Sequence, residues 1–122
     1  MDLKECYTAA GADYEDVIRR FMSEERVDRF LNMFLKDQSF DLLCQAMETG
    51  SYEEAFRAVH TMKGICMNLG LSALLEACAA LTENLRAGEP DSETQRCFDR
   101  AREEYRRTAG AIKSHLGQGS GS

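Results

Sequence analysis

The sequence predicts an all-α fold: an up-and-down antiparallel four-helix bundle with short extra N-terminal helices. Its 122 residues include one proline and no tryptophan. Its long segments are rich in Ala, Leu, Met, Glu and Arg, which lose little rotamer freedom in a helix. Apolar residues recur at the i, i+3, i+4 and i+7 spacing of a helix face. A chain of this length can bury roughly two-thirds of its unfolded surface in one core, so we expect one domain over residues 1–116.

The N-terminal helices are expected within about residues 13–36. The first has Asp13 as its N-cap, and the second follows Ser23 as N-cap and ends near Asp37. Each has one apolar stripe: Tyr14, Val17, Ile18 and Phe21 in the first, and Val27, Phe30, Leu31 and Phe34 in the second.

The core bundle is expected over about residues 38–116. Gly50 can take the left-handed conformation that ends many helices, and "GEPDS" is the clearest loop. Short connections make consecutive helices antiparallel neighbours. The predicted helices cover residues 39–48, 52–69, 71–87 and 92–116.

Composition excludes several classes of function. The net charge is −6 with no basic block, which argues against nucleic acid as a partner. No run of 18 apolar residues and no signal-peptide pattern occurs, so we expect a cytoplasmic protein without a membrane partner. Five cysteines without a C-x-x-C pair indicate apolar filling of the core, not a metal or redox site. Residues 117–122 have linker composition and are expected to be a flexible tail left by cloning.

The stretch "AVHTMKGICMNLG", residues 58–70, combines a histidine, a lysine and a glycine inside a predicted helix. At 100° per residue the apolar side chains cover an arc of roughly 140°, and His60 lies about 120° from its centre. Lys63 and Gly64 fall on the same exposed flank as His60, three and four residues away, where helical side chains are neighbours. The core-facing set is Tyr52, Ala55, Phe56, Val59, Met62, Cys66 and Leu69.

This flank has a simple interpretation and a chemical one. Each residue alone could be an ordinary surface residue, although glycine inside a helix costs about 1 kcal/mol relative to alanine. Together they suggest a phosphoryl carrier. An imidazole is ordinarily mostly neutral at pH 7 and can act as a nucleophile. Lys63 could stabilise phosphoryl oxygens, and Gly64 would leave space beside the ring. The other histidine, His115, has no such neighbours in sequence.

The same stretch resembles the signature of histidine-containing phosphotransfer (HPt) domains, H-x-x-K-G-x-x-x-x-L-G. His60, Lys63, Gly64, Leu69 and Gly70 match it in register. The resemblance implies that His60 accepts a phosphoryl group at Nε2 from a receiver-domain aspartate and passes it to another receiver. It further implies that Lys63 contacts the phosphoryl oxygens and that Leu69 and Gly70 set the end of the helix.

The resemblance also implies partners: response-regulator receiver domains and a hybrid sensor histidine kinase. Met67 and Arg57 are the expected partner contacts, and Met67 is bulkier than the small residue that many members carry there. Met62 replaces a leucine of the family with a residue of similar volume. We expect a monomer without cofactor or metal of its own, because the Mg²⁺ belongs to the receiver.

Two alternatives remain at this stage. The first is a helical-bundle adaptor that docks receiver or kinase domains without being phosphorylated. The second is an intrinsic enzyme such as a kinase or phosphatase, but the sequence has no P-loop, Gly-rich nucleotide loop or carboxylate-histidine metal cluster. We therefore expect a phosphorelay intermediate and not a free-standing catalyst.

Overall fold

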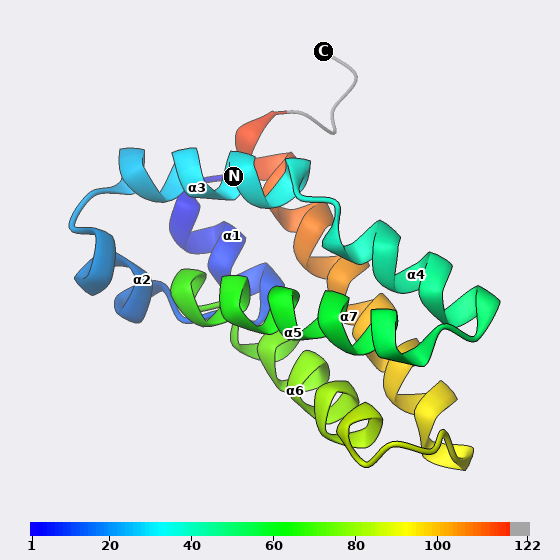
Figure 1. Ribbon diagram of the computed structural model, residues 1–122. Coiled ribbons are helices and arrows are strands. Elements are labelled where there is room, and N and C mark those ends of the chain that lie inside the picture. The colour runs from blue at the N-terminus through cyan, green and yellow to red at the C-terminus, as the bar shows by residue number, and fades with distance from the viewer. Residues whose placement is uncertain (118–122) are drawn as a thin grey trace.

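The computed structural model describes residues 1–117, and within them the chain forms seven α-helices and no strand. The all-α class predicted from the sequence is confirmed (Figure 1). Of the predicted tail, Gly117 ends the last helix in a left-handed conformation, and residues 118–122 lie outside the described residues. The helices are α1 (Leu3–Ala10), α2 (Tyr14–Phe21), α3 (Glu24–Lys36), α4 (Ser39–Thr49), α5 (Tyr52–Leu69), α6 (Ser72–Arg86) and α7 (Ser92–Leu116).

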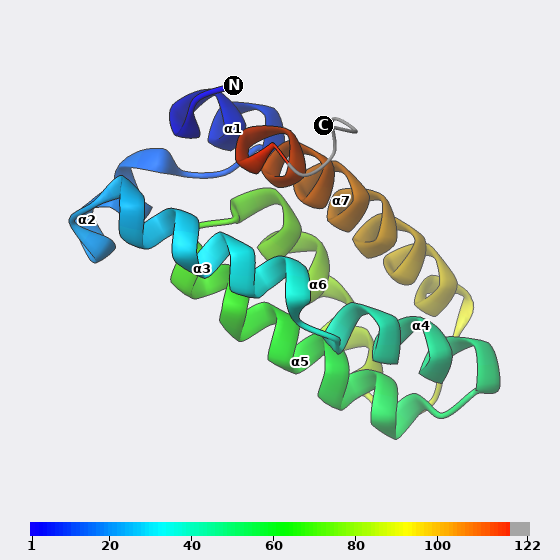
Figure 2. The same ribbon diagram turned by 90° about the horizontal axis from the view of Figure 1, so that it is seen from above.

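Helices α4 to α7 form a bundle in which each helix packs against the next. The ribbon reverses direction after Gly50, at Gly70 and in the loop 87–91 (Figures 1 and 2). The rings of Phe40 and Tyr105 stack with centroids 3.9 Å apart and join α4 to α7. α3 runs ahead of α4 along the same edge of the molecule and contacts α5 and α7.

Helix α1 was not predicted, because we placed the N-terminal helices within about residues 13–36. It begins at a capping box in which the Asp2 carboxylate accepts from the Glu5 amide. Its buried residues recur at helical spacing, and it packs on α7, far from it in sequence (Figure 2). These buried residues are Leu3, Cys6, Tyr7 and Ala10.

Other local predictions agree with the structure, with one correction. Asp13 and Ser23 cap α2 and α3 through their side chains, and Gly50 ends α4 with φ 73°. Phe30, expected on the inner stripe of α3, is 38% exposed and instead packs its ring against Phe21 of α2. The short α2 therefore covers part of α3 and leaves one edge of the Phe30 ring in solvent.

The core is mostly apolar, and it includes buried cysteines as well as a few buried Ser and Thr side chains. Cys66 of α5 and Cys78 of α6 are fully buried, and the hydrogen bond between the two thiols together with burial raises the pKa of the Cys66 thiol far above its usual range. Both cysteines act as small apolar side chains in this interface. None of the helices within residues 1–117 is both long and apolar enough to cross a membrane.

Candidate functional site

His60 lies in the middle of α5, the helix that contacts both α4 and α6. The buried face of α5 points into the bundle and fixes which residues face solvent. Five of the seven residues in the predicted core set are buried, together with Ala58, which was not in that set, whereas Tyr52 and Phe56 are half-buried. The buried residues of α5 are Ala55, Ala58, Val59, Met62, Cys66 and Leu69.

The imidazole of His60 is exposed. Within residues 1–117 neither of its ring nitrogens has a hydrogen-bond partner. Its ring instead lies nearly parallel to that of Phe56, with an interplanar angle of 9° and centroids 5.9 Å apart. Both nitrogens are therefore open to an approaching group.

Lys63 lies one turn after His60 and is partly buried, whereas the sequence placed it on an exposed flank. Its position at the edge of the apolar stripe explains this, because a lysine stem can cover apolar surface while its ammonium stays in water. In the described part of the chain Lys63 forms no ion pair. Its charge is available to an anion held at His60.

Gly64 is exposed, and a β-carbon built there would have no heavy atom within 4 Å. The fold itself therefore does not require glycine at this position. Glycine inside a helix costs about 1 kcal/mol relative to alanine. The missing side chain opens space only toward solvent, on the flank that carries His60.

The two expected partner contacts are both on the surface. Met67 is 54% exposed, a large apolar side chain in solvent two turns after His60. Arg57 is exposed one turn before His60 and forms an ion pair with Glu53 at 2.8 Å. A surface ion pair of this kind contributes little and exchanges readily, so Arg57 can reach a partner.

The C-terminal end of α5 is held by the N-terminal helices, which sequence reasoning did not foresee. The Arg20 guanidinium donates to the carbonyl oxygens of Met67 and Asn68 at 2.8 and 2.5 Å. The Tyr7 hydroxyl donates to the Leu69 carbonyl at 2.7 Å. These carbonyls are among the last four of the helix and have no partner inside it.

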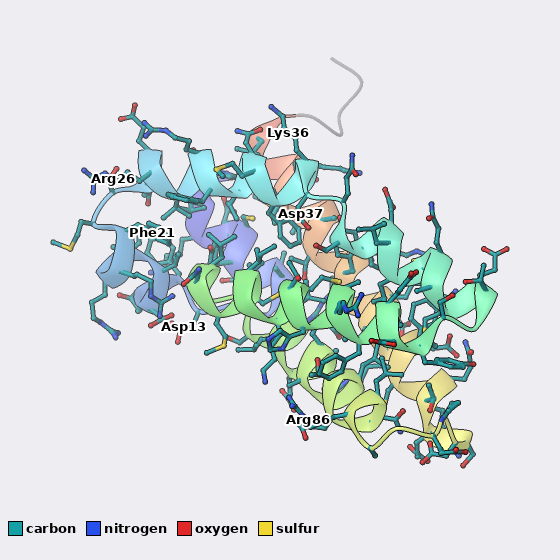
Figure 3. All side chains as sticks on the ribbon, viewed as in Figure 1. Asp13, Phe21, Arg26, Lys36, Asp37 and Arg86 are labelled. Atoms are coloured by element: carbon teal, nitrogen blue, oxygen red, sulfur yellow. The ribbon has the colours of Figure 1, made fainter. Side chains whose placement is uncertain are left out.

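Gly70 ends α5 and also allows a close contact. Its φ is +65°, and a β-carbon there would lie 3.0 Å from the Asp13 carbonyl oxygen. The Asp13 amide donates to the Gly70 carbonyl at 2.8 Å, so the start of α2 lies directly against this turn (Figure 3). The predicted helix-ending role of Gly70 therefore has a second cause in the packing of α2.

An apolar groove of about 400 Å³ opens between α2, α3 and the end of α5. Its α5 residues lie some 80–180° around the helix from His60, so His60 does not line it. Phe21 and Asp37, both labelled in Figure 3, lie on two sides of this groove. The other lining residues are Arg20, Phe30, Met33, Phe34, Ile65, Asn68 and Leu69.

Sequence reasoning missed the contact of Phe56 with His60 and the contact of Arg86 with Phe56. Phe56 was assigned to the core, but it is only half-buried and its ring faces the imidazole. Arg86 of α6 places its guanidinium carbon 5.3 Å from the centroid of the Phe56 ring. The i, i+4 spacing of Phe56 and His60 is the signal that could have shown the first contact.

Within residues 1–117 no three His, Cys, Asp or Glu side chains are grouped so as to hold a metal ion. Arg57 and Lys63 are the basic residues within one turn of His60 on α5, and Arg86 of α6 contacts the ring of Phe56.

The sequence profile of the Hpt domain family matches residues 29–115. This match covers well over half of the chain and contains α4, α5 with the His60 flank, α6 and all but the last residue of α7. The chain belongs to the Hpt domain family. Hpt domains are phosphocarrier modules and not catalysts, and they work with receiver domains and kinases in two-component phosphorelays. Helices α1 and α2 lie outside the matched residues. No curated protein and no solved structure matches the chain.

Proposed function

We propose that this protein is a histidine phosphotransfer intermediate, which accepts a phosphoryl group on His60 from a receiver aspartate and passes it to a second receiver. One observation carries the proposal: His60 is exposed on a flank where Gly64 presents no side chain, and among residues 1–117 neither the His60 ring nitrogens nor the Lys63 ammonium has a partner. Membership of the Hpt domain family supplies the context.

The transfer needs only the lone pair of a neutral imidazole. Nε2 attacks the phosphorus of the aspartyl phosphate, the bond from phosphorus to the aspartate oxygen breaks, and the aspartate leaves as a carboxylate. The proton on Nδ1 stays in place, so no general base is required. The reverse step, with the aspartate of a second receiver as nucleophile, returns His60 to its starting state.

Lys63 and Gly64 act on the group that His60 carries. The Lys63 ammonium stabilises the charge on the phosphoryl oxygens as it develops during transfer. Gly64 lets the rim of the receiver's active site approach the imidazole along the helix. Mg²⁺ belongs to the receiver in this scheme, and the carrier contributes no metal ligand.

The partners in this scheme are receiver domains and a hybrid sensor kinase, which meet a monomeric carrier. We assign the carrier function to the bundle of α4 to α7, with Met67 and Arg57 as contacts at the two ends of the exposed flank. A docking adaptor that is never phosphorylated is the competing function, and it would bind receivers without need of the imidazole.

Transfer of label from a phosphorylated receiver in the presence of Mg²⁺ tests the proposal. The adduct should be acid-labile and base-stable, and His60→Gln should abolish it while receiver binding persists. The matched control is His115→Gln, which removes the other of the chain's two histidines and should leave the adduct in place. Label retained in His60→Gln would refute the assignment, and binding without labelling by any receiver would favour the adaptor.

A further inference from the structure

The ring of Phe56 is the one aromatic ring in contact with the imidazole of His60 within the described residues. The two residues are one turn apart on α5, and their rings are nearly parallel at a centroid distance of 5.9 Å. Helical side chains lean toward the N-terminus of their helix, so a residue at i+4 is directed over the residue at i. Offset parallel rings at 4.5–7 Å are a favourable arrangement of aromatic groups.

Phe56 is itself held from two sides. It is partly buried and packs against the apolar core. Arg86, labelled beside α6 in Figure 3, places its guanidinium 5.3 Å from the Phe56 centroid, within the range of a cation–π contact. The one ion partner of Arg86 within residues 1–117 is Glu83, an exposed neighbour on the same helix at 3.4 Å. Phe56 is therefore fixed to the bundle, whereas His60 projects from it.

A stacking contact leaves the ring nitrogens of an imidazole accessible, whereas a hydrogen bond occupies one of them. A hydrogen bond would orient the imidazole but would occupy a ring nitrogen, and a nucleophile needs its nitrogen unoccupied. Contact through the face of the ring restricts rotation and leaves the edge, where both nitrogens lie, open. His60 has this second arrangement, with no hydrogen bond to either nitrogen in the described chain.

We infer that Phe56 is a positioning residue for His60, and that Arg86 supports it from α6. The pair sets the direction of the imidazole before a receiver arrives, so that less ordering of the ring remains to be done in the transfer step. This inference rests on the proposed function of His60 and extends it to two side chains that do not touch the phosphoryl group.

Phe56→Leu is the direct test, because it keeps an apolar side chain at this half-buried position and removes the ring. In the unphosphorylated protein, the His60 ring protons should move toward random-coil chemical shifts, and the side-chain couplings of His60 should report rotamer averaging. The maximal transfer rate from a phosphorylated receiver should fall about two- to ten-fold, the range that an aromatic pair energy implies. The receiver concentration at half-maximal rate should not change, and Phe56→Tyr should restore both readouts.

Tyr52→Leu is the matched control, since it removes another half-buried aromatic of α5 that does not stack on His60. It should change neither the His60 signals nor the rate. If Phe56→Leu proves too unstable to assay, Arg86→Gln gives the same test from the surface of α6, with smaller shifts in the same direction.

The outcomes separate this inference from the proposed function. A wild-type protein that no receiver phosphorylates would refute the proposed function, and the NMR arm would still decide whether Phe56 orders the ring. Normal transfer with unchanged His60 signals in Phe56→Leu would overturn the inference alone. A change in half-saturation without a change in maximal rate would also overturn it, because Phe56 would then be a docking residue.

Discussion

Gly64 occupies a position inside α5 where the fold would accept a side chain. A β-carbon there meets no heavy atom within 4 Å, so alanine should stabilise the helix by about 0.5–1 kcal/mol. Glycine at residue 64 therefore makes the helix less stable than alanine would. We attribute it to the space that a receiver domain needs beside His60. Function and stability should therefore respond in opposite directions at this residue.

We predict that Gly64→Leu will unfold at a temperature no lower than wild type and will lose transfer through steric exclusion of the receiver. Gly110 of α7 offers a matched control, because it is also an exposed helical glycine whose β-carbon would meet nothing within 4 Å. Gly110→Leu should transfer at the wild-type rate. Thermal unfolding and label transfer on the three proteins test this, and a fully active Gly64→Leu would refute the clearance argument.

Lys63 contributes mainly its charge on this account, since it forms no ion pair within the described residues and only its stem covers apolar surface. Lys63→Ala should slow transfer roughly ten-fold, equivalent to about 1.4 kcal/mol of transition-state stabilisation. Its circular dichroism spectrum and unfolding midpoint should match wild type. Lys113→Ala, an exposed lysine near the end of α7, is the control. An unchanged rate in Lys63→Ala would remove the proposed role.

The N-terminal helices bind the backbone at the end of α5, the helix that carries His60. Arg20, Tyr7 and Asp13 all bond to backbone groups between residues 67 and 70. Sequence reasoning predicted that Gly70 ends this helix, because glycine at that place is a local signal. It could not predict which helices would lie against the turn, because these contacts join residues more than forty positions apart.

We predict that Gly70→Ala will cost more stability than Gly50→Ala. Both glycines have positive φ, +65° and +73°, and alanine pays about 1–2 kcal/mol for that conformation. At Gly50 the nearest atom to a new β-carbon is on Tyr52 at 3.9 Å, whereas at Gly70 it is the Asp13 carbonyl oxygen at 3.0 Å. Chemical denaturation of both variants measures the difference. Equal losses of unfolding free energy in the two variants would contradict the prediction, because they would show that α2 can move away from the new β-carbon without destabilising the fold.

The helices themselves were largely readable from sequence, and the reason is local. Apolar periodicity and the caps at Asp13, Ser23 and Gly50 act within a few residues, and the structure has those caps. Helix α1 was missed because the surface against which it packs belongs to α7, at the far end of the sequence. The contact of Phe56 with His60 was missed because a residue at the edge of an apolar stripe can face either the core or a neighbouring side chain on the surface.

His115 of α7 connects three distant parts of the chain, namely α7, α3 and the N-terminus. Its Nε2 lies 2.7 Å from Asp28 of α3, and its Nδ1 lies 3.1 Å from the Met1 carbonyl oxygen. Burial lowers the pKa of His115, but the hydrogen bonds to Asp28 and Met1 and the Asp28 charge raise it, and the net direction is upward. Sequence reasoning found no partners for this histidine, because both come from the N-terminal part of the chain, far from residue 115.

A raised pKa in the folded state means that the protonated form stabilises the fold. This contribution is complete below the ordinary imidazole pKa near 6.5 and is lost as pH rises through the higher folded value. His115→Gln should therefore lower the free energy of unfolding by about 1 kcal/mol at pH 5.5 and by less at pH 8.5. Urea denaturation across this range tests the sign. A loss that grows with pH would contradict it.

The phosphoryl chemistry proposed for this protein depends on His60. Its ring is exposed, its nitrogens have no hydrogen-bond partner among residues 1–117, and Gly64 leaves the same side of the helix without a side chain. The most direct measurement is a phosphorus NMR spectrum of protein labelled with ¹⁵N in its histidines, taken after incubation with a phosphorylated receiver and Mg²⁺. We predict one phosphohistidine signal coupled to Nε2, absent in His60→Gln and retained in His115→Gln. A signal that persists in His60→Gln, or phosphorus bound to any residue other than histidine, would contradict the account.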